Sequence, residues 1–115
     1  MAKPLIKRAR SFPVTIFIAG SYGKAMKILQ EYCDEIGFCV TIEHTYYIYK
    51  GGKEDGIIVG LINYPRFPSE PSDIIDRAKE IAEKLRVGLG QESYSIQTPH
   101  DTIWYSYRKG DAIDD

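Results

Sequence analysis

Cysteine is scarce in this sequence, and the motifs that usually reveal an enzyme or a metal site are missing. The 115 residues include two cysteines, Cys33 and Cys39, which form no CxxC pair and have no histidine cluster beside them. This spacing argues against a disulfide scaffold and against a zinc site. No GxSxG, HExxH or kinase motif occurs either. We therefore expect no catalytic residues, no metal, no cofactor and no enzymatic activity.

The sequence also lacks an excess of charge and a long hydrophobic run. Fifteen lysines and arginines stand against 16 aspartates and glutamates, for a net charge of -1. No general positive field attracts this chain to nucleic acid or to anionic lipid. No segment is apolar for long enough to be a signal peptide or a membrane span. We expect a cytoplasmic protein whose partners include neither a nucleic acid polymer nor a membrane.

Length and composition are typical of one domain, which we place over residues 1–115 with its core at about 12–108. The chain is 43% hydrophobic and 27% charged, and at this size it can bury a core without cross-links. Residues 1–11 hold four bases and no acid, whereas residues 110–115 hold three acids and no base. We expect this basic arm and this acidic tail to be flexible.

Hydrophobic periodicity predicts the element order βαββαββ. The first helix should begin at a Ser21 cap and end at Gly37, and the second should have Ser69 or Ser72 as its cap and Gly88 or Gly90 as its end. The expected strands cover 12–19, 38–49, 57–61, 94–98 and 103–107. This order is a split βαβ arrangement with an added final strand. We predict an α+β fold in which an antiparallel-rich sheet has both helices on one face and its first strand beside its third.

Aromatic residues are concentrated in the predicted strands or at their ends, which contain Trp104 and seven of the nine tyrosines. One layer of helices covers one face of a sheet, so we expect aromatics on the other face to form a patch for a planar ligand or a second copy. The ordinary alternative is that each ring simply suits a half-buried sheet. The tyrosines concerned are Tyr46, Tyr47, Tyr49, Tyr64, Tyr94, Tyr105 and Tyr107.

The loop NYPRFP carries the strongest candidate for a binding site. Its prolines restrict the backbone around Arg66, so the guanidinium loses less entropy when it meets an anion. Phe67 could stack on a ring, while Asn63 and Tyr64 could contact polar edges. The alternative is a surface loop with Phe67 tucked into the core. Arg108, which ends the last strand, could face either ligand or water.

The segment AGSYGK places a turn and Lys24 at the start of the first helix, where free amides attract phosphate. It is not a Walker A motif, because Lys24 follows a shorter spacing and precedes alanine. An ordinary capped turn is the more economical interpretation. His44 and His100 have no nucleophile or carboxylate nearby in the sequence, so we expect them to be structural.

Residues 37–73, followed by LGQESYSIQT, resemble the first-described Thoeris anti-defence family, which are small phage proteins that sequester a signal. The resemblance rests on the GxCVT entry, the IYxGG turn, VGLINYPRFP and the GQxSYxI strand that contains Gln91. Members bind cyclic ADP-ribose isomers made by TIR-domain enzymes in the cytoplasm of the infected bacterial host. They do so without degrading them.

The resemblance implies further properties. Members form homodimers or hexamers with pockets between protomers, and the family is also associated with cyclic di- or trinucleotides at separate pockets. Carried over by motif, Arg66 and Arg108 are the leading phosphate ligands, followed by Lys24 and Lys27 on the first helix. The implied ligand-binding set also includes Asn63, Tyr64, Phe67, Gln91 and Trp104.

Two other hypotheses use the same topology. An RRM-like domain would bind single-stranded RNA on exposed sheet aromatics, although the RNP signature is missing and the net charge is negative. An acylphosphatase-like enzyme would use an arginine-bearing phosphate loop and an asparagine that positions water. That hypothesis rests on fold analogy alone.

Overall fold

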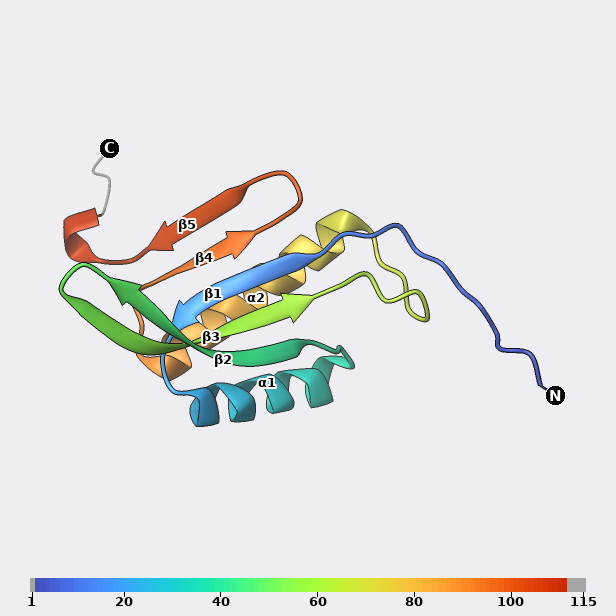
Figure 1. Cartoon of the computed structure of the whole chain (residues 1–115), viewed down its shortest axis with the longest axis horizontal. Coiled ribbons are helices and arrows are strands. Elements are labelled where there is room, and N and C mark those ends of the chain that lie inside the picture. Colours follow the sequence, from blue (N-terminus) through green and yellow to red (C-terminus); the bar gives the residue numbers. More distant parts are fainter. Residues whose placement is uncertain (1, 112–115) are drawn as a thin grey trace.

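The computed structural model describes residues 2–111 and contains a five-stranded antiparallel sheet with two helices on one face (Figure 1). The strand order across the sheet is β2-β3-β1-β4-β5. In chain order the elements are β1 (Val14–Ala19), α1 (Tyr22–Ile36), β2 (Thr41–Tyr49), β3 (Gly52–Leu61), α2 (Pro71–Leu89), β4 (Ser93–Gln97), β5 (Thr102–Ser106) and the short 3-10 helix η1 (Lys109–Asp111). The α+β fold and the element order predicted from sequence are confirmed.

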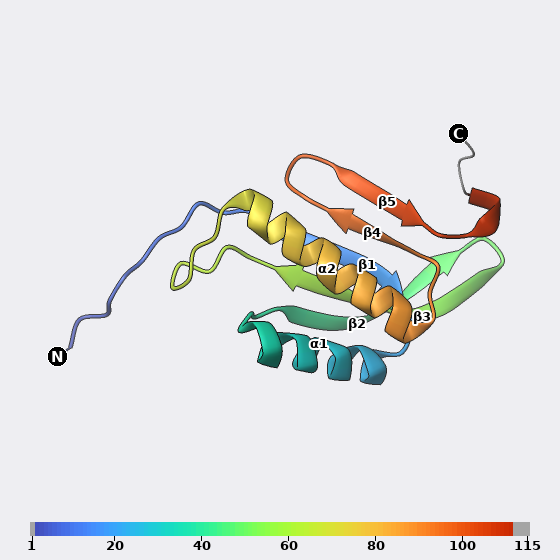
Figure 2. The same ribbon diagram turned by 180° about the vertical axis from the view of Figure 1, so that it is seen from behind.

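The core lies between the sheet and the two helices, which run side by side across one face (Figure 2). Val14, Ile16 and Ile18 of β1 are buried, and each pairs with a buried residue of β3. The expected neighbourhood of the first and third strands is therefore present, in antiparallel register. Leu61, the last residue of β3, pairs with Val14, the first residue of β1. The loop that follows β3 therefore lies at this end of the sheet and leads into α2.

Both helices have local signals at their ends, although one differs from the expectation. The Ser21 side chain accepts a hydrogen bond from the Lys24 backbone N–H at 3.3 Å, and Gly37 closes α1 at φ +75°. The N-cap of α2 is Glu70 rather than Ser69 or Ser72, because Pro71 takes the first helical position. Proline suits that position since its missing N–H would be unpaired there anyway. Gly90 ends α2.

The first hairpin is tighter than its sequence suggests. β2 begins at Thr41 rather than Phe38, and β3 begins at Gly52 rather than Ile57, so the turn contains only Lys50 and Gly51. Gly51 adopts φ +85°, which glycine reaches without strain. The polar residues of the GGKEDG stretch thus extend the hairpin as strand instead of forming a long turn.

The tyrosines do not gather on the uncovered face of the sheet as expected. Tyr94 and Tyr105 alternate onto the helix side, where their rings stack at 5.0 Å. Tyr94 is buried and donates a hydrogen bond to Glu83 of α2 at 2.6 Å. Tyr47 and Trp104 do lie on the uncovered face, where they border one small hollow together with Phe17. The aromatic patch is therefore smaller than alternation alone suggested.

The two ends of the chain differ. Residues 2–11 run in an extended form away from the sheet (Figure 1), whereas Phe12 is buried in the core. At the other end, η1 contains Asp111, which accepts a hydrogen bond from Ser106 Oγ at 2.6 Å. The rest of the acidic tail, residues 112–115, lies outside the described residues. Within residues 2–111, no helix is long and apolar enough to cross a membrane.

Candidate functional site

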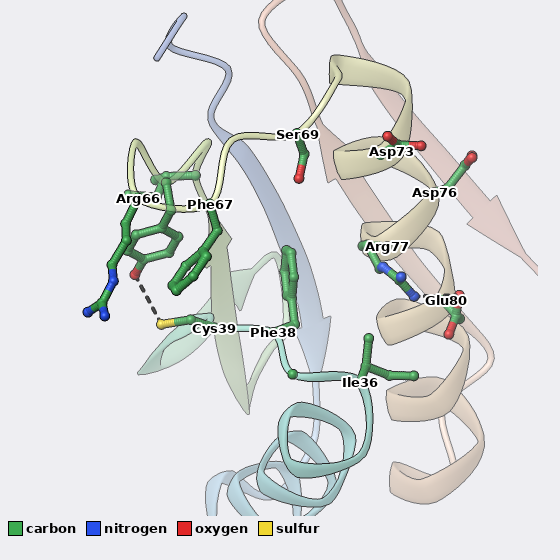
Figure 3. A pocket seen from close by; sticks show the side chains of 13 residues that line it. Ile36, Phe38, Cys39, Arg66, Phe67, Ser69, Asp73, Asp76, Arg77 and Glu80 are labelled. Atoms are coloured by element: carbon green, nitrogen blue, oxygen red, sulfur yellow. Dashed lines mark hydrogen bonds and ion pairs between the residues drawn. The ribbon is translucent and has the colours of Figure 1, made fainter. Parts of the chain in front are cut away.

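A cavity of about 950 Å³ lies at the Val14 end of the sheet, between the loop after β3 and the first half of α2 (Figure 3). Its size suits a nucleotide, since ligand pockets usually measure about 300–1,000 Å³. Three segments line the cavity: the end of α1 with the residues that follow it, the loop after β3, and the first half of α2. The lining residues are Ile36, Gly37, Phe38, Cys39, Ile62, Tyr64, Arg66, Phe67, Ser69, Asp73, Asp76, Arg77 and Glu80.

The loop wall of this cavity presents a guanidinium and an aromatic ring together. The Phe67 backbone N–H donates to the Tyr64 carbonyl at 2.9 Å, and this turn exposes both Arg66 and Phe67. The Arg66 guanidinium carbon lies 5.2 Å from the centre of the Phe67 ring. Phe67 is 71% exposed, so it is not tucked into the core. A ring and a cation presented side by side can stack a base and attract an anion.

Asn63 holds the loop rather than facing the cavity. Its Oδ1 accepts a hydrogen bond from the Ser69 backbone N–H at 2.8 Å. Its Nδ2 donates to the Arg10 carbonyl at 2.9 Å. Both polar ends of this side chain are therefore engaged with backbone. The structure therefore gives Asn63 a positioning role instead of the expected ligand contact. Its hydrogen bonds fix the two ends of the segment that carries Arg66.

Tyr64 and Cys39 link the loop to the start of β2. Cys39 Sγ donates to Tyr64 Oη at 3.1 Å (Figure 3). This hydrogen bond, with a smaller contribution from burial, raises the pKa of the Tyr64 phenol above its ordinary value. A phenol is already neutral near pH 7, so the Tyr64 hydroxyl can donate or accept hydrogen bonds at the cavity edge.

The α2 wall is mostly acidic. Asp73, Asp76 and Glu80 line it together with Arg77, because residues three or four apart share one face of a helix. Arg77 Nη1 lies 3.8 Å from Glu80 Oε2, and Tyr32 donates to Glu80 at 3.2 Å. Figure 3 shows Arg66 and these carboxylates on opposite walls. The cavity can thus hold an anionic group at the loop and hydroxyl or cationic groups at the helix.

The first acidic residues of α2 also have an ordinary structural explanation. Asp73 and Asp76 suit the positive end of the helix dipole, and that explanation conceals their position on the cavity. Phe38, Cys39, Arg77 and Glu80 were not among the expected site residues. A stripe of polar residues at helical spacing after a rigid loop is the signal that could have indicated them.

Arg108, Trp104 and Gln91 form a separate group on the uncovered face of the sheet. They border a small hollow of about 220 Å³ together with Phe17 and Tyr47. Arg108 lies 3.6 Å from Glu92 and 3.7 Å from Asp111, so its charge is partly balanced. Arg108 follows the end of β5 that pairs with Ser93, whereas Arg66 follows the opposite end of the sheet. One chain does not bring the two guanidinium groups together.

Lys24 and Lys27 lie on the exposed part of α1 and line neither hollow. The Lys24 backbone N–H already donates to the Ser21 cap. Among residues 2–111, no group of three or more histidine, cysteine, aspartate or glutamate side chains is arranged to hold a metal ion.

Comparisons with known proteins identify the fold. No protein-family model and no curated protein matches this chain. Two solved structures are similar over 90% of this chain and 96% of theirs. A phage SAM lyase in the apo state has a TM-score of 0.65 at 16% identity. A phage SAM lyase in complex with S-methyl-5'-thioadenosine has a TM-score of 0.63 at 14% identity. At this identity, the similarity shows that the chain has the fold of these phage proteins.

These comparisons correct one expectation. The lack of catalytic motifs led us to expect a protein that is not an enzyme, yet both similar structures are named as lyases, which are enzymes. That finding contradicts the expectation. The missing motifs do not exclude catalysis, because an enzyme that accelerates a reaction by positioning and electrostatics needs no sequence motif for a nucleophile and a base.

Proposed function

We propose that this chain binds an adenine-containing small molecule in the cavity between the NYPRFP loop and α2. Within that class, we propose a cyclic ADP-ribose isomer such as glycocyclic ADP-ribose. The supporting observation is the pairing of Arg66 with the exposed ring of Phe67 on the wall of a cavity of about 950 Å³. A purine needs a flat surface, and a pyrophosphate needs a cation; this wall offers both.

The charges in the cavity suit the rest of such a ligand. Ribose hydroxyls can donate to Asp73 and Asp76, which line the α2 wall. Arg77 forms an ion pair with Glu80, so Arg66 is the main cation available to the pyrophosphate. One guanidinium leaves part of two negative charges unneutralised. We therefore propose that a second copy of this chain completes the site, as the family resemblance implies.

The biological role that follows is interference with an immune signal. By binding the signal, the chain would lower its free concentration in the cytoplasm of an infected bacterial host. Capture at low signal concentration requires a nanomolar Kd, equivalent to about -12 kcal/mol. A charge-assisted hydrogen bond contributes about 1.5–3 kcal/mol and a stacked base about 1–3 kcal/mol. Several contacts must therefore converge, which also favours a site built from two chains.

A second candidate function has its own support. The two similar structures are SAM lyases, and one holds S-methyl-5'-thioadenosine, an adenine nucleoside. The sulfonium of SAM is a cation, and the cavity offers it the ring of Phe67 and the carboxylates of Asp73 and Asp76. Under this alternative, the chain would bind SAM in the same cavity and cleave the bond between its sulfur and its aminobutyrate chain. The electron pair would go to sulfur, releasing S-methyl-5'-thioadenosine, while the carboxylate of SAM would close on the freed carbon to give a lactone.

The other two hypotheses receive less support. An acylphosphatase-like reaction needs an asparagine that is free to position water, but both ends of the Asn63 side chain are bonded to backbone. An RNA-binding sheet needs cations around its aromatic rings. The hollow beside Trp104 instead includes Glu54, and Arg108 there is flanked by two carboxylates.

Native mass spectrometry with three compounds tests the proposal. The full chain is incubated separately with glycocyclic ADP-ribose, with S-methyl-5'-thioadenosine and with SAM. The masses of the intact complexes and of the released ligands are then measured. We expect a complex with glycocyclic ADP-ribose that Arg66→Ala weakens and that Lys50→Ala, at the remote hairpin turn, leaves unchanged. No complex with glycocyclic ADP-ribose overturns the proposal. Conversion of SAM to S-methyl-5'-thioadenosine supports the lyase alternative.

A further inference from the structure

The extended N-terminal arm exposes two large aliphatic side chains between basic residues. Leu5 is 83% exposed and Ile6 is 69% exposed, with Lys3 before them and Lys7 and Arg8 after them. The arm projects from the β1 end of the molecule (Figure 1). Adjacent exposed aliphatic residues in an extended segment are typical of a surface that another molecule covers.

A groove of about 490 Å³ between α1 and α2 has the complementary character. Its floor is apolar, formed by Ile28 and by the buried ring of Tyr32, and Val87, which is 68% exposed, lies at its edge. Gly88 lies against Ile28, where a side chain would collide with the Ile28 methyl group, so the helices approach closely there. The rim carries the carboxylates of Glu31, Glu35 and Glu83, with Lys84 as the one base among its lining residues.

Two of these rim carboxylates lack a cation. Glu83 is bonded to Arg86 and Tyr94. Glu31 and Glu35 are exposed and form no ion pair in the described part of the chain, residues 2–111. They are four residues apart on one helix face, where like charges repel. A basic partner in the groove would remove that repulsion.

The charge balance of the whole chain points to its own arm as the partner. Residues 1–11 carry four of the 15 bases and no acid, so the remainder has 11 bases against all 16 acids. The arm is therefore positive and the body negative. The order base, proline, two aliphatic residues and two bases in the arm matches an apolar floor within an acidic rim.

The arm of the same molecule is too short to occupy this groove. Asn63 bonds both to the Arg10 carbonyl and to the Ser69 N–H, which ties the base of the arm near the start of α2. From there, Leu5 reaches about 17 Å at full extension. Val87 lies near the far end of the 19-residue helix α2, roughly 24 Å along its axis from Pro71.

We propose that the arm of a second copy occupies the α1–α2 groove, with Leu5 and Ile6 on Val87 and Ile28, and with Lys7 and Arg8 near Glu31 and Glu35. Two chains that exchange arms in this way form a closed, two-fold dimer, in which each groove receives one arm. The groove shares no lining residue with the cavity at the NYPRFP loop. The exchange can therefore fail while ligand binding stands, and the reverse.

Sedimentation velocity on the full chain tests the contact. We expect a dimer that dissociates as salt increases, because its charge pairs are exposed. Leu5→Asp and Val87→Asp should each weaken dimerisation at least about tenfold, equivalent to about 1.4 kcal/mol. Both positions are exposed, so folding should be preserved. Ile48→Asp, at the 79% exposed hairpin position, is the matched control and should dimerise normally.

A charge exchange and a labelled cross-linking experiment complete the test. Glu31→Lys with Glu35→Lys should abolish the dimer, and Lys7→Glu with Arg8→Glu in the partner should restore it in a mixture of the two proteins. Carbodiimide cross-linking of mixed 14N and 15N protein should join Lys7 to Glu31 or Glu35 between differently labelled chains. A monomeric wild type, a dimer unaffected by both Leu5→Asp and Val87→Asp, or cross-links only within one chain overturns the proposal. Arm-dependent binding of a nucleic acid by a chain that stays monomeric also overturns it.

Discussion

Asn63 accepts a hydrogen bond from the Ser69 backbone N–H at 2.8 Å while donating to the Arg10 carbonyl at 2.9 Å. One side chain thus connects three stretches of backbone: the end of β3, the approach to α2 and the base of the arm. The loop that carries Arg66 and Phe67 connects the end of β3 to the approach to α2, so Asn63 holds both of its ends. The affinity of the candidate site should therefore depend on a residue that does not line the cavity.

Asn63→Ala removes both hydrogen bonds and should lower the free energy of unfolding by about 1–3 kcal/mol, at about 0.5–1.5 kcal/mol for each bond. It should also weaken ligand binding, because the loop must then be ordered on binding. Urea unfolding and calorimetry with glycocyclic ADP-ribose measure the two effects. Asn63→Asp keeps the acceptor for Ser69 and should retain more affinity than alanine. Equal affinity of Asn63→Ala and wild type would show that the loop needs no such anchor.

Phe67→Ala should reduce affinity for an adenine-containing ligand while leaving stability nearly unchanged. Stacking of one base is worth about 1–3 kcal/mol, so Kd should rise about 5- to 150-fold. The ring is 71% exposed, and surface substitutions usually alter stability by less than about 0.5 kcal/mol. Calorimetry and thermal unfolding check the two statements. Ile48→Ala, at a 79% exposed position on the hairpin outside the cavity, should keep wild-type affinity, and a similar loss there would indicate a non-specific effect.

Acid should destabilise the protein partly through Glu83. Hydrogen bonds from Arg86, followed by those from Tyr94 and Tyr107, lower the pKa of the Glu83 carboxyl below its ordinary value of 4.5. A lowered pKa in the folded state stabilises the protein above the unfolded value, and this contribution is lost as pH falls through the folded pKa. Glu83→Gln should therefore lower stability at neutral pH and flatten its decline below about pH 4.5. Thermal unfolding as a function of pH measures both.

Glu43→Gln is the control for this pH dependence, since Glu43 is exposed on β2. Its stability profile should follow that of wild type throughout the acid range. If Glu83→Gln and wild type lose stability in parallel below pH 4.5, the Glu83 network does not contribute to acid sensitivity.

The expectations that failed depended on partners that lie far away in the sequence. Alternation correctly placed Tyr94 in a strand, but only the packing of α2 showed that Tyr94 bonds to Glu83 and that the Tyr107 ring lies against Arg86. The rigid NYPRFP loop was recognisable from its prolines, yet the double bonding of Asn63 was not. The absence of catalytic motifs led to the expectation of no enzymatic activity, which conflicts with the names of the two similar structures, both SAM lyases.

The amino-acid sequence was sufficient to predict the element order, the caps at Ser21 and Gly37, and the adjacency of the first and third strands. These features follow from periodicity, local hydrogen bonding and the handedness of crossovers, which act over short stretches of chain. The tertiary structure was needed to place Arg66 and the carboxylates of α2 on the lining of one cavity, and Arg108 at the opposite end of the sheet. Strand register and helix packing fix such pairings, and both depend on the whole core forming at once.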